Sequence, residues 1–147
     1  FVGLLTGAVA GLATITPAAG YVTVANACLI GIVAGAVCYV AVDLKNRAGL
    51  DDALDVWGVH GVGGFLGVVL LGMLGTVTVN AAGANGLLYG GTEFFLKEMA
   101  AVVASSAYAF LFTWAMLWLI NRVTPVRTTE AEEQALDAAL HGEVAYE

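Results

Sequence analysis

Four long apolar runs separated by short polar segments dominate the pattern of the chain. They cover residues 1–16, 22–44, 53–76 and 94–120. Such runs predict membrane-spanning helices, because a helix that crosses a hydrocarbon core needs about 20 mostly apolar residues. The first run is short for a span and ends at Thr16-Pro17, where proline removes a backbone donor and restricts the residue before it. The sequence therefore predicts an all-α, polytopic membrane helical bundle over residues 1–122.

The last part of the chain, residues 123–147, is predicted to be a cytoplasmic tail. Thr129 and Glu132 form a capping box, which predicts that a short helix begins there. A weak apolar stripe follows on this helix: Ala135, Leu136, Ala139 and Leu140. A helix this short is marginal in isolation, so we expect it to dock against the loop of residues 43–52, with its acids facing Lys45 and Arg47.

Charge supports this division of the chain. Hydrophobic residues make up 60% of the sequence, far above the usage of soluble domains, which is about 45–50% even with glycine included. The net charge is −7, and residues 124–147 hold six acids and one arginine, so most of the acidity lies in the tail. No basic patch indicates nucleic-acid binding.

Basic residues also predict the orientation of the spans. Lys45 and Arg47 lie between the second and third runs, and Arg122 and Arg127 follow the fourth. The positive-inside rule places both segments in the cytoplasm. Residues 80–93 hold no lysine or arginine and are predicted to form an external loop.

Small residues recur at a four-residue spacing on the first two runs. Gly7 and Gly11 form one pair, and Gly31 and Gly35 form another. This spacing lets a neighbouring helix come close, so we expect close helix packing at these glycines.

His60 is the most informative residue of the third run. If that helix begins near Asp52, His60 lies about 12 Å along it, near the middle of a hydrocarbon core about 30 Å thick. A charged group at that depth costs about 2.5–3.5 kcal/mol or more, so ionisable side chains there face protein or a cavity. His60 is either a hydrogen-bonding residue between helices or part of a transport path. In both cases we expect it to be buried, turned away from lipid and uncharged at pH 7.

Carboxylates gather where the third run begins. Asp51 and Asp52 suit a helix start, because they accept hydrogen bonds from free amides and favour the positive end of the helix dipole. Asp55 follows within the first turn. It is interpreted either as a further helix cap or as an anchor for a gate or loop.

Three motifs, in this order, resemble the ammonium transporter family (Amt, with Mep and Rh relatives). They are Ala18-Ala19-Gly20 after Thr16-Pro17, then Asp55-Val-Trp-Gly-Val-His60-Gly-Val, and finally Leu136-Asp137 followed by His141-Gly142-Glu143, Ala145 and Tyr146. The resemblance covers essentially the whole chain and implies the last four of eleven membrane helices with the carboxy-terminal tail. Because Phe1 opens directly into an apolar run with no initiator methionine, we expect the chain to be a fragment.

The resemblance implies a homotrimer in which each subunit has its own narrow hydrophobic pore for ammonium or ammonia. His60 would be one of two pore histidines, Val56 an apolar residue lining the cytoplasmic side, and Asp55 an acid at the cytoplasmic pore exit. The tail would be regulatory, and the residues that carry its motif are Leu136, Asp137, His141, Gly142, Glu143 and Tyr146. A PII-type nitrogen signalling protein is the cytoplasmic partner that the resemblance suggests.

Elementary chemistry fits such a pore. An apolar lumen excludes the ammonium cation by desolvation but passes neutral ammonia, so the cation must release its proton on entry. A neutral imidazole offers one donor and one acceptor, which can bind ammonia and relay a proton. Whether ammonia moves alone or together with a proton is left open.

Two other functions are compatible with parts of the pattern. An ammonium sensor would have a transporter-like domain of the same fold fused to signalling modules. A membrane metalloenzyme would need Asp55 and His60 as ligands, but their five-residue offset turns the two side chains about 140° apart on a helix. With no HExxH-like cluster in the sequence, we expect no enzymatic activity, metal or cofactor.

Overall fold

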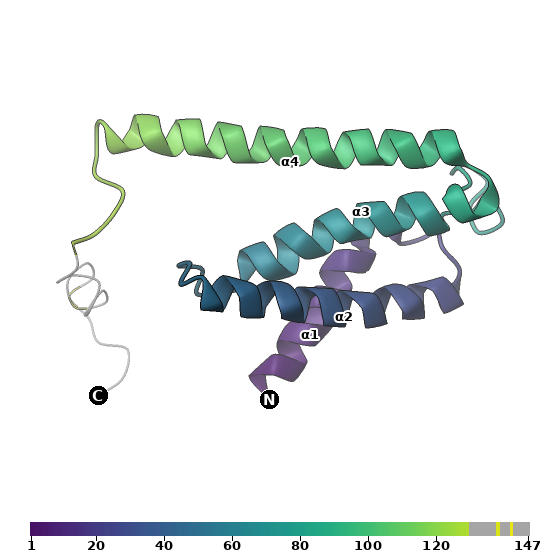
Figure 1. The fold of residues 1–147 in the computed structure, drawn as a ribbon, viewed down its shortest axis with the longest axis horizontal. Coiled ribbons are helices and arrows are strands. Elements are labelled where there is room, and N and C mark those ends of the chain that lie inside the picture. Colours follow the sequence, from purple (N-terminus) through teal and green to yellow (C-terminus); the bar gives the residue numbers. More distant parts are fainter. Residues whose placement is uncertain (130–137, 139–141, 143–147) are drawn as a thin grey trace. The chain divides into compact units, whose positions relative to one another are not determined.

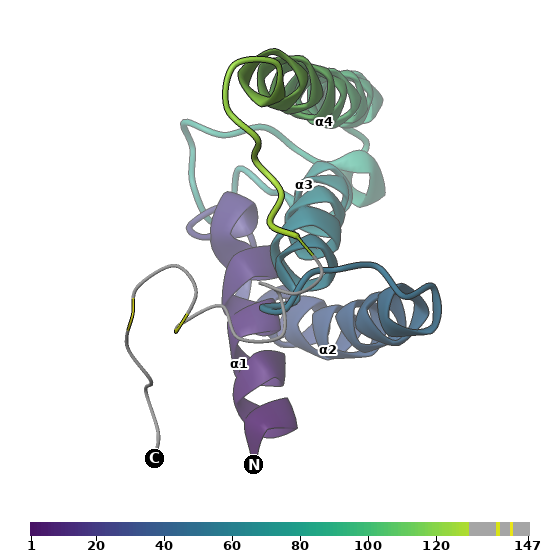
Figure 2. The ribbon, with the colours of Figure 1, turned by 90° about the vertical axis from the view of Figure 1, so that its left-hand side faces the viewer.

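The computed structural model describes residues 1–129, 138 and 142. The chain divides into two compact units, residues 1–106 and 107–147, and the boundary falls within one long helix. Within the described part every regular element is helical, in agreement with the predicted all-α fold. The first unit holds three helices that pack against one another: α1 (Val2–Ile15), α2 (Val24–Arg47) and α3 (Val62–Leu74). In Figure 1, α1 crosses α2, and Figure 2 shows the same helices turned by 90°.

Proline ends the first helix where the sequence predicted. Helix α1 covers Val2–Ile15, and a 3-10 turn with proline in its first positions follows at Thr16–Ala18. Helix α2, Val24–Arg47, begins at the Thr23 cap, whose hydroxyl accepts a hydrogen bond from the Asn26 amide at 3.3 Å. The hydroxyl satisfies one of the amides that an α-helix leaves free at its start.

The third apolar run does not form a uniform α-helix. It opens with a π-helical turn, Trp57–Gly61, and continues as helix α3, Val62–Leu74. The helical segment therefore begins about four residues later than residue 53. Residues up to Asp55 belong to the connection from α2 instead, and Asp55 has a left-handed backbone with φ 54°. A π-turn inside a helix is rare and is often found at functional sites.

The external loop predicted for residues 80–93 is folded back on itself by hydrogen bonds. The amide of Val77 donates to Asn85 Oδ1 at 3.1 Å, and the amide of Gly86 donates to the Gly75 carbonyl at 2.7 Å. A short 3-10 turn, Leu87–Tyr89, then leads to helix α4, Thr92–Asn121.

Close helix packing occurs at glycines of the π-turn and α3. A Cβ atom built on Gly58 would lie 2.7 Å from Val42 Cγ2, and one on Gly63 would lie 2.9 Å from Thr14 Oγ1. A Cβ on Gly67 would collide with the Thr14 carbonyl oxygen. Because glycine has no side chain, the start of the third run can lie against α2 and α3 can lie against α1.

The close packing expected at other glycines is not found among the described residues. A Cβ atom added at Gly7, Gly11, Gly31 or Gly35 would meet open space. That expectation is therefore wrong for this chain taken by itself. The glycines that approach α1 or α2 closely are Gly58, Gly63 and Gly67 of the third run.

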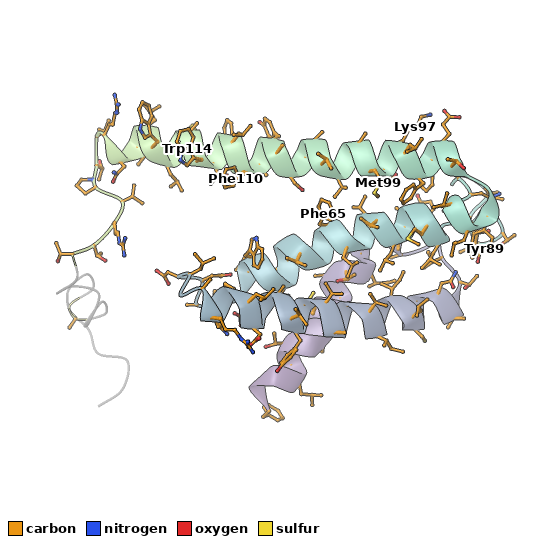
Figure 3. All side chains as sticks on the ribbon, viewed as in Figure 1. Phe65, Tyr89, Lys97, Met99, Phe110 and Trp114 are labelled. Carbon is orange, nitrogen blue, oxygen red and sulfur yellow. The ribbon has the colours of Figure 1, made fainter. Side chains whose placement is uncertain are left out.

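Three helices are long and apolar enough to cross a membrane: Val24–Arg47, Trp57–Leu74 and Thr92–Asn121. Apolar side chains project from these helices, including Phe65 on α3 and Phe110 and Trp114 on α4 (Figure 3). Phe110 is 70% exposed and Trp114 is 61% exposed. Such surfaces need an apolar environment, so the fold is a multi-pass membrane bundle.

The end of α4 carries an interfacial aromatic group. The guanidinium carbon of Arg122 lies 3.8 Å from the centroid of a Trp118 ring. Tyr108 stacks on Phe112 nearer the middle of the helix, at 5.5 Å between centroids. Tryptophan and arginine together are typical of the level where a span leaves the hydrocarbon for the headgroups.

The packing at Gly67 gives a first prediction, for the natural full-length protein with any sequence that precedes Phe1. Replacing Gly67 by alanine forces α3 away from Thr14 and Pro17, and overpacking of this kind costs about 1–3 kcal/mol. We expect a lower midpoint of thermal unfolding in detergent, measured by size-exclusion chromatography after heating. Gly64→Ala is the control on the same helix, because a Cβ there meets nothing within 4 Å. Equal midpoints for the two variants would contradict the packing.

Candidate functional site

His60 lies in the π-helical turn Trp57–Gly61, at the start of the third apolar span. Its side chain is exposed in the described chain, so the expectation that His60 is buried is wrong for this chain taken alone. The physical reason is that α1 and α2 cover Gly58 and Val59 but leave the neighbouring His60 uncovered. An exposed imidazole on an apolar span needs another surface to face, whether protein or a cavity.

Asp52 caps the turn that carries His60. Its Oδ1 atom accepts a hydrogen bond from the Val56 amide and its Oδ2 atom accepts one from the Trp57 amide, both at 2.9 Å. The Trp57 amide contributes most to lowering the pKa of Asp52 below its ordinary value, with smaller contributions from the Val56 amide and the charge of Lys45. The cap is therefore present near neutral pH and is lost only as the pH falls through that lowered pKa.

Asp55 is a loop anchor and not a side-chain cap, which decides between its two interpretations. Its Oδ1 atom lies 2.7 Å from Lys45 Nζ, and its main-chain carbonyl accepts the Val59 amide at 2.9 Å. Lys45 Nζ also donates to the Asp52 carbonyl at 2.6 Å. The lysine side chain is only 5% exposed and the Asp55 side chain 29%. One ammonium group therefore ties the end of α2 to the connection that leads into the third span.

Lys45 was missed as a site residue from the sequence, because Lys45 was interpreted as a marker of orientation and as a contact for the tail. The available signal was the presence of a lysine in the last turn of one span and a carboxylate at the start of the next. The acids of the tail, which were expected to face Lys45 and Arg47, lie outside the described residues. Within the described part, Lys45 is covered and paired with Asp55. Arg47, in contrast, is 76% exposed and pairs with Asp43 at 2.8 Å within its own helix.

Val56, expected to line the cytoplasmic side of a pore, lies between the two anchored acids and His60 in the chain and is 50% exposed. A cavity of about 470 Å³ lies nearby, between α1, α2 and the start of the third span. Asp55 and Val59 line it together with Ala10, Cys38 and Val42, whereas His60 does not. The described residues thus place His60 on a different face from this cavity.

Among the described residues, no group of three or more His, Cys, Asp and Glu side chains comes together in a metal-binding arrangement. The Asp55 carboxylate, the only acid proposed beside His60 as a ligand, is held by Lys45.

Most of the regulatory tail motif lies outside the described residues: Leu136, Asp137, His141, Glu143 and Tyr146. Gly142 is described and has φ 68°, a backbone conformation that favours glycine. Its amide donates to the Ala138 carbonyl at 3.2 Å. The regulatory role of the tail stays a prediction.

Comparison with known proteins identifies relatives over nearly the whole chain. The model of the Ammonium Transporter Family matches residues 1–146. An ammonium transporter of Bacillus subtilis is 44% identical over an alignment of 147 residues, which covers 99% of this chain and 36% of that protein. The ammonium transporter Amt1 of Archaeoglobus fulgidus is 43% identical over 145 residues, covering 98% of this chain and 37% of that protein.

Solved structures agree with these relatives. The crystal structure of Saccharomyces cerevisiae Mep2 matches with a TM-score of 0.82 and 37% identity, covering 88% of this chain and 30% of that one. The chain spans about a third of the length of the curated relatives that it matches. Both the matched residues and the degree of identity lead to one conclusion: the chain belongs to the ammonium transporter family.

Proposed function

We propose that this chain forms part of a transmembrane path for ammonium or ammonia, with His60 on the wall of that path. The observation that carries the proposal is the exposed imidazole of His60 on an apolar span of membrane-crossing length. Lipid acyl chains offer no hydrogen-bond partner, so this group is expected to face a cavity or another part of the protein. Relatives named as ammonium transporters supply the substrate class.

His60 would act on the substrate through hydrogen bonding. A neutral imidazole carries one donor and one acceptor, so it can hold ammonia in an otherwise apolar path. It can also take up and return a proton, because its charge changes near physiological pH. A second histidine, supplied from outside the described residues, would complete the pair that the family resemblance implies.

Val56 and Asp55 would form the cytoplasmic end of this path. Val56 is half exposed and apolar, which suits the wall of a path that admits the neutral molecule. Asp55 carries its carboxylate toward Lys45, so its proposed contribution is the shape of the exit and not a free negative charge.

Assembly and orientation complete the proposal. We place the connection at residues 48–56 and the tail in the cytoplasm, and residues 77–91 outside, as the positive-inside rule predicts. A homotrimer would cover exposed apolar side chains of this chain, and a PII-type nitrogen signalling protein would act on the cytoplasmic face.

Replacing His60 tests the function directly. In the natural full-length protein, His60→Phe keeps an aromatic ring and removes both polar ring atoms. A lost hydrogen bond in an apolar site costs about 1–3 kcal/mol, so we expect ammonium-driven flux in proteoliposomes to fall about ten- to a hundredfold. Phe65→Leu, on the same span, is the control and should keep its flux. Unchanged flux in His60→Phe would refute the path, and wild-type protein that moves no ammonium would favour the sensor.

Orientation can be tested by labelling single cysteines with a reagent that does not cross the membrane. Cysteine is placed at Asn46, Ala81 or Thr124, which are all exposed, in a background that carries Cys28→Ser. Asn85 is avoided because its side chain holds the Val77 amide. We expect labels at Asn46 and Thr124 from the cytoplasmic side and at Ala81 from the outside. Labelling of all three from one side would contradict the arrangement.

The tail can be tested through its one described motif glycine. Alanine in place of Gly142 must adopt a left-handed backbone, at a cost of about 1–2 kcal/mol. If the tail controls the path, we expect Gly142→Ala, and more strongly a deletion of residues 129–147, to lower flux while insertion and oligomeric state stay unchanged. Flux equal to wild type in both proteins would show that the tail has no control over transport.

A further inference from the structure

Lys45 occupies an unusual position for a lysine at the end of a membrane span. Its side chain is 5% exposed although it stands in the last turn of α2, where lysines ordinarily extend into water or headgroups. Neighbouring Arg47 follows the ordinary behaviour and is 76% exposed. Covering an ammonium group is unfavourable unless its donors are satisfied, so the contacts of Lys45 need an explanation.

Among the described residues, the ammonium group of Lys45 contacts the connection that leads to His60. Nζ donates to the Asp52 carbonyl at 2.6 Å and to Asp55 Oδ1 at 2.7 Å. Both acceptors lie at least seven residues further along the chain, so the lysine does not merely stabilise its own helix. It holds two points of the segment between α2 and the third span.

Each held residue in turn fixes part of the turn that follows. The Asp52 carboxylate accepts the amides of Val56 and Trp57, and the Asp55 carbonyl accepts the amide of Val59. The amides of Val56, Trp57 and Val59 therefore all donate to Asp52 or Asp55, the two residues that Lys45 contacts.

The geometry of this turn is not the one that an uninterrupted helix would adopt. Asp55 has φ 54°, which is uncommon for a residue with a side chain, and the Val62 amide reaches back five residues to the Trp57 carbonyl. A π-turn contains one residue more than an α-turn, so its presence decides toward which side His60 projects. On the opposite side, Gly58 lies so close to Val42 that even a methyl group would not fit.

We propose that Lys45 is a positioning residue for His60. Its ammonium group holds Asp52 and Asp55 in place, these two residues hold the first amides of the π-turn, and the turn aims the imidazole at the transport path. The inference rests on the proposed function of His60 but assigns a role to a residue that does not itself line the path. Removing the ammonium group should let the turn relax and displace His60 without altering the chemistry of the imidazole.

The test is a double-mutant cycle between Lys45 and His60 in the natural full-length protein. Lys45→Met keeps the length and apolar stem and removes the charge. We expect it to lower ammonium flux about ten- to a hundredfold, as misplacing a reacting group commonly does, but to cause no further loss in the His60→Phe background. Arg47→Met is the matched control, because in the described part of the chain Arg47 pairs with Asp43 of its own helix and does not hold the connection, and we expect it to keep wild-type flux in both backgrounds.

A second readout is independent of transport. Diethyl pyrocarbonate modifies imidazole, and mass spectrometry measures its rate at His60. We expect the rate to change severalfold in Lys45→Met and to stay at the wild-type value in Arg47→Met. If Lys45→Met does not fold, Lys45→Met with Asp55→Asn removes both charges together and leaves no covered charge unpaired. That double variant should show the same loss of flux and the same change in the rate of modification.

The outcomes separate the two proposals. Unchanged flux in His60→Phe overturns the proposed function, and the rate of modification then still decides whether Lys45 positions His60. Equal losses from Lys45→Met in both backgrounds, with an unchanged rate of modification, show that Lys45 has only a general structural role. A wild-type flux in Lys45→Met, with an unchanged rate, overturns the inference outright.

Discussion

A charge that leaves water needs an opposite charge, and this requirement organises the connection between α2 and α3. Lys45 is almost fully covered, and its ammonium group is satisfied by one carbonyl and one carboxylate of the segment that follows. Because Asp52 and Asp55 also receive the first amides of the third span, the same few atoms close the end of one helix and open the next. The start of the span that carries His60 is thereby tied to α2.

Close approach at glycines contributes further to the order of the first unit. Gly58 admits Val42 of α2, and Gly63 and Gly67 admit Thr14 of α1. In a membrane the hydrophobic effect does not drive helices together, so dispersion at such short distances carries much of the association. Both features act on the third span. The glycine contacts set its distance from α1 and α2, and the pair of Lys45 and Asp55 sets where it begins.

Prediction from the sequence succeeded where one dominant constraint determines the result. Long apolar runs have few alternatives to spanning helices, and Pro17 ended α1 because its ring excludes a continuing helix. Glycine spacing did not decide which helices meet. Gly63 and Gly67 have the same four-residue spacing as Gly7 and Gly11, yet only the first pair meets a neighbour among the described residues.

The candidate site was predicted less completely. Three motifs in order, one of which contains His60, indicated the family, but a local pattern does not encode whether α1 and α2 cover His60. The role of Lys45 was missed because its contact with Asp55 depends on the path of the intervening loop. In this loop Asp55 has a left-handed backbone although it is not a glycine, and the periodicity of the sequence does not predict that conformation.

The Lys45 pair also explains how a weak interaction can matter for function. Pairs that leave water gain little net stability, since the attraction mostly offsets the loss of hydration. Removing one partner is costly nonetheless, because the other charge is left without compensation. The consequence is a single defined arrangement of the connection, not a more stable fold. The proposed path for ammonia, with His60 on its wall, needs such a defined arrangement, because hydrogen bonds weaken steeply as their geometry departs from linear. A polar anchor outside the apolar span can thus set the position of a polar group inside it.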